Sequence, residues 1–218
     1  MNAFLYSGSV HNGDQAPLRD RRRAQTEREI GEVALTLFEK QGIDHTTVDE
    51  IARLAGVSPR TFFRYFATKE RAALVPHRDL EDRVDGMLST MRGEEPLLPQ
   101  LEALWGEVLK AFEDGDSEPG RQLLRVRRLM RTEPTLRMSA ASLDEERQHD
   151  LIARLTRLTG EPDGIRARVL TEVAAVSVRI ALDTWADSVE AGRPVDLLGT
   201  YARCRAQMRQ ALGEHAPL

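Results

Sequence analysis

The chain has 218 residues, enough for one or two domains and for a sizeable buried core. Hydrophobic residues make up 41% of it and charged residues 30%, a composition that is typical of globular proteins and excludes a disordered chain. No apolar run approaches the roughly 18 residues of a membrane span, no signal peptide is visible, and the single cysteine, Cys204, excludes an internal disulfide. A cytoplasmic protein without a membrane partner is therefore expected.

The formal net charge of −4 is unevenly distributed along the chain. Residues 19–75 contain 11 Lys/Arg and 9 Asp/Glu, a net charge of +2, whereas residues 76–218 contain 20 and 25, a net charge of −5. A basic end on an acidic body suits an anionic partner that binds at that end. Because the excess is small, it gives only modest support to such a partner.

The N-terminal part is expected to be a flexible tail, residues 1–18, followed by a helix. A basic run stands at the start of this helix and consists of Arg19, Arg21, Arg22 and Arg23. The run is either a solvated helix start or an arm that reaches a phosphate or the minor groove of DNA. Apolar residues at helical spacing then predict one buried face, made of Ile30, Val33, Ala34, Leu37 and Phe38. Gly42 is expected to end the helix in a left-handed conformation.

Two short helices with a tight turn between them are predicted next. Thr47 and Glu50 form a capping box at the start of the first helix. The buried face of that helix is expected to hold Val48, Ile51, Ala52 and Ala55. Gly56 supplies the positive φ that a sharp turn requires, and Ser58 caps the second helix. A helix, a turn with glycine and a second helix make a helix-turn-helix unit.

The second helix of this unit is rich in aromatic residues and arginines. Phe62 and Phe66 share one face at i, i+4 spacing, so both are expected in the core. Arg60, Thr61 and Arg64 fall on other faces, where their polar groups are free to meet DNA. Such a helix fits the major groove, where arginine can bond guanine through two parallel hydrogen bonds and threonine can contact the methyl group of thymine.

Beyond residue 78 the pattern is helical throughout, and Thr68 is expected to cap a fourth helix before it. Gly- and Pro-containing breakers separate the later helices, at residues 93–99, 115–120, 134, 160–164 and 192–194. No segment has a convincing strand period. The prediction is an all-α protein of about nine helices, with a helix-turn-helix domain at 19–75 and a larger helical bundle at 76–218.

Large apolar residues alternate with polar ones in the predicted bundle, and arginines that could meet an anionic head group crowd one of its helices. The residues singled out here are Leu101, Trp105, Leu109, Phe112, Leu124, Arg125, Arg128, Met130 and Val173. Salt bridges to the many acidic residues also explain these arginines, and that interpretation is favoured. The last two helices, near 165–190 and 197–212, have broad apolar faces that predict a four-helix dimer core. The residues expected at this dimer interface are Val176, Ile180 and Trp185.

An enzyme is the main alternative class. The five histidines have no zinc-site spacing, and neither a G-x-G-x-x-G motif nor a P-loop occurs. The carboxylates stand in helical charge patterns, which are typical of solvated faces. No catalytic residue, metal site or cofactor is therefore predicted. A DNA-binding protein without ligand control is a further alternative, but most of the large acidic bundle is not needed to hold DNA.

The segment FEKQGIDHTTVDEIARLAGVSPRTFFRYFATKE resembles the DNA-binding domain of the TetR (tetracycline-repressor-like) family, over roughly residues 25–75. The motifs G-x-x-x-T-T-V-x-x-I-A, A-G-V-S and F-x-x-K-E carry the resemblance. It implies a homodimer of all-helical subunits and a palindromic double-stranded DNA operator. It also implies that residues 76–218 are a ligand-binding and dimerisation domain, with a pocket lined by the apolar residues and arginines named above. A small apolar or amphipathic effector that binds there releases the DNA. The family's usual mode is repression, and the variant RTFFRYF resembles actinobacterial members.

The resemblance also implies roles for single residues. Base contacts are implied at Arg60, Thr61 and Arg64. Phosphate contacts are implied at Thr47, Ser58, Phe63, Tyr65 and Lys69. In the family, position 63 is usually a tyrosine whose hydroxyl binds phosphate, and Phe63 lacks that hydroxyl, so Tyr65 or Arg64 would have to replace the contact.

Overall fold

The computed structural model describes residues 18–75, 84, 87–115, 117–160, 163–193 and 195–213. Within these ranges the chain forms nine helices and no strand, which confirms the all-α prediction. The helices are α1 (Leu18–Gln41), α2 (Val48–Leu54), α3 (Pro59–Tyr65), α4 (Lys69–Ala73), α6 (Leu97–Lys110), α7 (Glu118–Thr132), α8 (Pro134–Thr159), α9 (Ile165–Glu190) and α10 (Leu197–Gly213). Of the expected tail, only Leu18 lies within the described residues, and it begins α1.

The starts of the three short helices are fixed by the side chains that the sequence places there. The hydroxyls of Thr47, Ser58 and Thr68 each accept a hydrogen bond from the backbone N–H three residues later, at 3.2, 3.0 and 3.2 Å. Each cap satisfies a donor that the helix itself leaves unpaired. Gly42 and Gly56 have φ angles of 81° and 68°, as predicted for the two turns.

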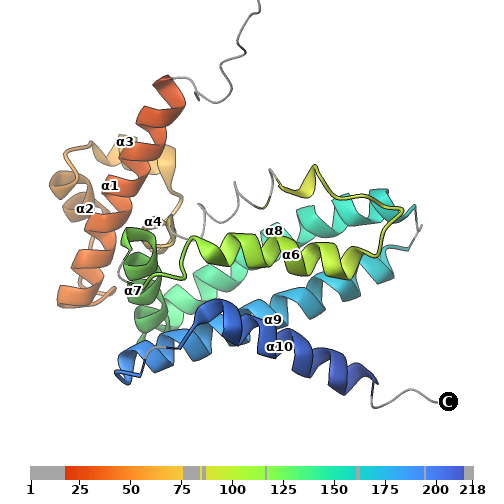
Figure 1. Ribbon diagram of the computed structural model, residues 1–218. Helices are drawn as coiled ribbons and strands as arrows, with labels where there is room; N and C mark the ends of the chain where they lie inside the picture. The colour runs from red at the N-terminus through yellow and green to blue at the C-terminus, as the bar shows by residue number, and fades with distance from the viewer. Residues whose placement is uncertain are drawn as a thin grey trace, which may run out of the picture.

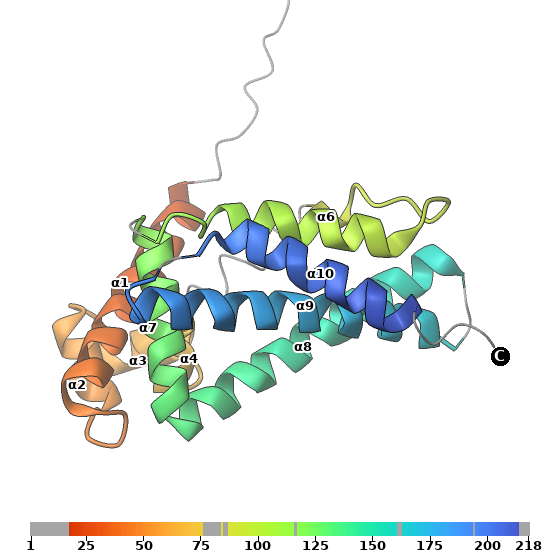
Figure 2. The same ribbon diagram turned by 60° about the horizontal axis from the view of Figure 1, so that its bottom comes forward.

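The molecule has two lobes, with α7 between them (Figure 1). Helices α1 to α4 form the N-terminal lobe, while α6, α8, α9 and α10 form an elongated bundle. Within the bundle, α9 packs against α6, α8 and α10, and α10 also packs against α6. The second view shows α7 running across the end of α9 that lies nearest to α1 (Figure 2). Among the described residues, no helix combines the length and the apolar character that crossing a membrane requires.

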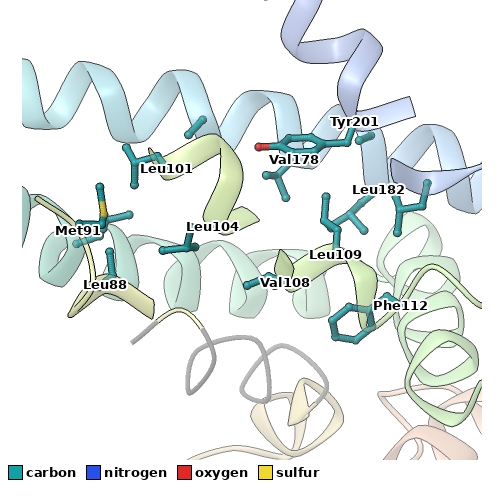
Figure 3. Packing of buried hydrophobic residues seen from close by; sticks show 14 of the residues in the cluster. Leu88, Met91, Leu101, Leu104, Val108, Leu109, Phe112, Val178, Leu182 and Tyr201 are labelled. Carbon is teal, nitrogen blue, oxygen red and sulfur yellow. The ribbon is translucent and has the colours of Figure 1, made fainter. Parts of the chain in front are cut away.

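The bundle is held together by an apolar cluster in which α6, α9 and α10 meet (Figure 3). Leu101 and Leu109 of α6 have no exposed surface, and Tyr201 of α10 is buried beside them. The hydroxyl of Tyr201 donates a hydrogen bond to the carbonyl oxygen of Glu102 at 3.2 Å. Burial raises the pKa of this phenol above its ordinary value, so Tyr201 remains a neutral donor.

A second apolar cluster belongs to both lobes. It contains the buried residues of α1 to α4, including Ile30, Phe38, Ile51 and Phe62. It also contains five residues of α7 and α8, namely Val126, Leu129, Leu136, Ala140 and Leu143. The predicted boundary at 75/76 adjoins residues 76–83, which lie outside the described ranges, and it does not separate two cores. The N-terminal lobe instead completes its core with α7 and the first half of α8.

Helices α1 and α4 approach each other closely at Gly31. A Cβ atom at this position would lie 2.9 Å from the carbonyl oxygen of Ala72 and 2.9 Å from a methyl group of Val75. The backbone of α4 cannot move away from such an atom cheaply, because Ala72 and Val75 are themselves buried. The absence of a side chain at Gly31 therefore determines how α4 is seated against α1.

Candidate nucleic-acid interface

Helix α3 lies on the surface of the N-terminal lobe with one face buried and one face open. Phe62 has no exposed surface and Phe66 is 4% exposed, so both anchor the buried face as predicted. Arg60 and Arg64 are exposed on the other side of the helix. The guanidinium of Arg64 lies over the ring of Tyr65, 5.1 Å from its centroid. Two arginines are thus presented to solvent on a helix that cannot rotate.

The start of α3 is preorganised by a pair of hydroxyls. Ser58 Oγ and Thr61 Oγ1 lie 2.9 Å apart, and Ser58 Oγ also accepts the N–H of Thr61. Thr61 is half-buried, so its side chain keeps one rotamer while part of it faces solvent. Phe63 is 58% exposed and meets Phe62 edge to face, with ring centroids 5.6 Å apart. An exposed ring therefore stands between the two arginines in sequence.

The loop before α2 differs in one detail from the predicted capping box. Thr47 caps the helix as expected, but the carboxylate of Glu50 accepts a hydrogen bond from Gln41 Nε2 at 2.8 Å. The same amide donates to the carbonyl oxygen of His45 at 2.9 Å. Gln41, at the end of α1, is therefore a loop-binding residue that local sequence patterns did not reveal.

Lys69 is half-buried and reaches back to the same loop. Its ammonium donates to the carbonyl oxygens of Ile43 and Thr46, at 2.6 and 2.9 Å. An ammonium has three N–H donors, so two of them are occupied by these bonds. The resemblance implied a phosphate contact here, and the structure shows a long-range contact to the backbone, which the spacing of F-x-x-K-E does not disclose.

The structure brings the predicted DNA-contact residues together on one lobe, over the start of α2, all of α3 and the start of α4. These residues are Thr47, Ser58, Arg60, Thr61, Phe63, Arg64, Tyr65 and Lys69. Their contacts with DNA remain predictions.

The predicted pocket residues are not brought together in the same way. Leu101, Leu109 and Phe112 are buried in the bundle core, where Trp105 and Leu124 pack against them. They fill space rather than line it. Val173 is half-buried on α9, and Met130 packs against the second cluster, which α1 to α4 share with α7 and α8.

Arg125 joins α7 to α1. Its guanidinium donates to both carboxylate oxygens of Glu39, at 2.8 to 3.0 Å, to Glu32 at 2.6 Å and to Thr36 at 3.1 Å. Hydrogen bonding to Glu39 raises the pKa of the guanidinium further above its already high value. Arg125 therefore holds the two lobes together, as the salt-bridge interpretation of these arginines expected.

Three further arginines of α7 pair with the C-terminal part of α9. Arg127 lies 2.8 Å from Asp183, and Arg128 lies 3.3 Å from Glu190. Arg131 pairs with both Asp187 and Glu190. The predicted pocket residue Arg128 is thus committed to a surface ion pair, and α7 carries ion pairs toward α1 and toward α9.

Two surface hollows lie near the predicted site regions. One, of about 450 Å³, is an open groove lined by residues of α1, α2 and α7, among them Val33, Leu54 and Gln122. The other, of about 210 Å³, lies at the edge of the bundle beside α6 and is lined mostly by apolar groups, including Met87, Met91 and Leu104. Neither contains a residue of the predicted pocket.

The predicted dimer residues divide into two groups. Trp185 is 2% exposed and packs in the core of its own subunit, so it differs from the prediction of an interface residue. Val176 is half-buried and Ile180 is 46% exposed on the outer side of α9.

Other chemistry-bearing groups are dispersed. Within the described ranges, no three His, Cys, Asp or Glu side chains gather in a way that could hold a metal ion. Cys204 is half-buried on α10, and burial raises the pKa of its thiol.

The all-helical fold, with a helix-turn-helix at one end, defines a DNA-binding transcriptional regulator. The model of a family described as "Bacterial regulatory proteins, tetR family" matches residues 30–71. The chain is 30% identical over 174 residues to the HTH-type transcriptional regulator TcmR of Streptomyces glaucescens, with 77% of this chain and 76% of TcmR covered. The chain therefore belongs to the TetR family, a class of DNA-binding regulators and not of enzymes.

Two further similarities were found, one to a curated protein and one to a solved structure. MftR, a transcriptional regulator of Mycobacterium tuberculosis, is 31% identical over 112 residues, which cover 51% of this chain and 55% of MftR. The solved structure of the fatty acid degradation regulator FadR from Bacillus halodurans superposes with a TM-score of 0.51 at 18% identity, covering 89% of this chain and 96% of that one. At that identity the second match concerns the fold alone.

Proposed function

We propose that the protein is a transcriptional repressor that binds a palindromic DNA operator as a homodimer and releases it when a small apolar or amphipathic effector binds the bundle. The observation that carries the proposal is the two-sided character of α3. Its inner face is fixed by Phe62 and Phe66, while Arg60 and Arg64 are free on its outer face. A helix seated in this way can enter the major groove without rearrangement of the lobe.

The proposed contacts with DNA are of two kinds, contacts with base edges and contacts with phosphates. Arg60, Thr61 and Arg64 read base edges, with Arg60 or Arg64 bonding guanine through its paired donors. Thr47, Ser58 and Tyr65 contact phosphates beside the groove, which fixes register and carries no sequence information. The exposed ring of Phe63 lies against sugars in place of a phosphate contact.

A second copy of the chain is the proposed partner of α9. Three of its exposed apolar residues, Ile165, Val169 and Ile180, are 62%, 53% and 46% exposed. With the half-buried Val173 and Val176 they recur at intervals of three and four residues, so they form one stripe along the helix. Pairing two such stripes removes apolar surface from water and sets the two α3 helices at a fixed separation, about 34–36 Å for successive major grooves.

The effector site is proposed at the edge of the bundle, in the hollow that Met87, Met91 and Leu104 line. Its volume of about 210 Å³ is below the roughly 300–1,000 Å³ of most ligand pockets, so an effector would have to enlarge it. A ligand that prefers the enlarged bundle shifts the population away from the form that fits DNA. Action on an operator places the protein in the cytoplasm.

The test is selection of bound duplexes from a random DNA pool by the purified protein, followed by challenge of the complex with a panel of metabolites. We expect an enriched palindrome and its release by one chemical class of apolar or amphipathic compound. Failure to enrich any duplex would contradict the DNA-binding proposal. An enriched palindrome that no compound releases would favour DNA binding without ligand control.

A further inference from the structure

The lysine at the start of α4 occupies an unusual position for a residue implied to bind phosphate. Lys69 is half-buried, and its ammonium is bonded to the carbonyl oxygens of Ile43 and Thr46, which precede it by 26 and 23 residues. Both bonds are short enough to be strong, since hydrogen bonds from a charged donor are among the best that proteins make. The two carbonyls flank the turn that leads from α1 into α2.

That turn is closed by a dense set of hydrogen bonds. Thr46 is 1% exposed, and its hydroxyl donates to the carbonyl oxygen of Gly42 at 2.8 Å. The N–H of Thr46 donates to Ile43 at 3.1 Å. Gln41 binds the turn from the side of α1, through the carbonyl of His45 at 2.9 Å. The backbone of the turn thus has few alternatives to the conformation that Lys69 and Gln41 hold.

The position of this turn determines where α2 begins. Thr47, the cap of α2, directly follows Thr46, whose carbonyl oxygen Lys69 binds. Because Lys69 itself belongs to the first turn of α4, just beyond α3, the bond ties the beginning and the end of the helix-turn-helix to each other. A shift of the turn would move Thr47 and α2 relative to the reading face of α3.

We infer that Lys69 is a positioning residue, which supports DNA binding by holding residues 43–46 and hence Thr47 and α2, and not by contacting a phosphate. This inference rests on the proposed DNA-binding function. It differs from the role that the resemblance implied, because it assigns the ammonium of Lys69 to the backbone of the turn before α2.

Three methionine variants separate the two roles. Lys69→Met keeps the length of the side chain and removes the charge together with both hydrogen bonds. Gln41→Met removes the bonds that hold the same turn without changing the charge. Lys40→Met, at an exposed lysine in the last turn of α1, removes one charge near the turn and serves as the control. Each is assayed on a duplex that the wild-type protein selects, by titration at several salt concentrations, with the melting temperature and circular dichroism recorded.

We expect Lys69→Met and Gln41→Met to remain folded and to bind the selected duplex roughly tenfold more weakly than the wild type. A loss of this size corresponds to about one good contact. The slope of log K against log[salt] should be the same for Lys69→Met as for Lys40→Met. For Gln41→Met it should be the same as for the wild type. If Lys69 contacts a phosphate, its loss should instead make the slope about 0.9 less steep than that of Lys40→Met, which is the contribution of one neutralised phosphate.

A slope for Lys69→Met that is less steep than that of Lys40→Met would overturn the inference in favour of a phosphate contact. Unchanged affinity of both folded variants would overturn it in favour of a role in stability alone. If Lys69→Met does not fold, Gln41→Met decides, since native affinity in that variant would show that the turn does not govern binding. Wild-type protein that retains no duplex would overturn the proposed function itself, and the inference with it.

Discussion

Neighbouring residues of α3 have opposite surroundings, and this difference defines the exposed face that is proposed to read DNA. Phe62 has no exposed surface, while Phe63, the next residue, is 58% exposed. Successive residues of a helix are separated by about 100°, so an anchor at Phe62 forces Phe63 outward. Arg60 is exposed for the same reason. Single substitutions on this face can therefore change recognition without changing the core.

Replacement of Arg60 by alanine should abolish operator preference and leave the fold intact. A base contact by arginine contributes about 1–3 kcal/mol of discrimination, so affinity for the selected duplex should fall roughly tenfold to a hundredfold. Binding to unrelated duplex should change far less. Titration of both duplexes measures the difference, and Arg193→Ala, at an exposed arginine in the loop between α9 and α10, is the control. Unchanged preference would remove Arg60 from the reading residues.

Replacement of Phe63 by tyrosine should strengthen binding. The ring is already exposed on α3, and the added hydroxyl restores the phosphate donor that is usual in the family. A net gain of about 0.5–1.5 kcal/mol corresponds to roughly twofold to tenfold higher affinity. Because the donor is neutral, the salt dependence should remain that of the wild type. Equal or weaker binding in titrations at constant salt would show that no phosphate lies within reach of position 63.

At the scale of elements, α7 is the joint between the lobes. Its arginines pair with α1 through Arg125 and with α9 through Arg127, Arg128 and Arg131. Its apolar residues Val126 and Leu129 pack into the core of the N-terminal lobe. A change in the bundle that moves α9 would therefore act on α7, and through α7 on α1.

Loss of the Arg125 pairs should loosen this joint. We expect Arg125→Met to lower the free energy of unfolding by about 1–2 kcal/mol, since Glu32 and Glu39 lose a partly buried partner, and to lower the melting temperature by about 2–6 °C. Calorimetry measures the shift. Arg121→Met, which removes an exposed pair with Glu118 inside α7, should have almost no effect. Equal shifts in the two variants would show that the contact with α1 adds no stability.

The elements that sequence predicted well are those whose causes are local. Thr47, Ser58 and Thr68 cap helices within three residues of themselves, so the short helices could be placed from the sequence. The partners of Arg125 and Lys69 could not be predicted, because they lie 86 to 93 and 23 to 26 residues away. Only the packing of α7 on α1, and of α4 beside the turn before α2, brings them together.

The lining of a pocket could not be predicted from the sequence for a related reason. Helical periodicity identifies apolar residues but does not distinguish those that fill a core from those that line a cavity. Leu109 and Phe112 fill the core, whereas Met130 contributes to the other cluster. Spacing likewise does not distinguish a core tryptophan from an interface one, and Trp185 is 2% exposed within the bundle cluster.

At the scale of the whole molecule, the apolar stripe on α9 is the surface through which two subunits are proposed to form a dimer. Val169 lies in the stripe and is 53% exposed, and an acidic side chain there would be buried without a partner in a dimer. We expect Val169→Glu to sediment as a monomer at micromolar concentration and to lose operator binding while keeping its helical content. Met138→Glu, at an exposed apolar residue of α8, is the matched control and should remain a dimer. A dimeric Val169→Glu would place the interface elsewhere.

The core that α1 to α4 share with α7 and α8 limits how such regulators can be recombined. Residues 18–75 taken alone would leave the partners of Leu136 and Ala140 facing water, so the segment is an incomplete module. A chimera that grafts this reading head onto the sensor of a relative should express as a stable protein only if the matching stretch of α7 and α8 travels with it. Exchange of only the exposed residues of α3, with Phe62 retained, leaves this shared core undisturbed, which makes it the simpler engineering route.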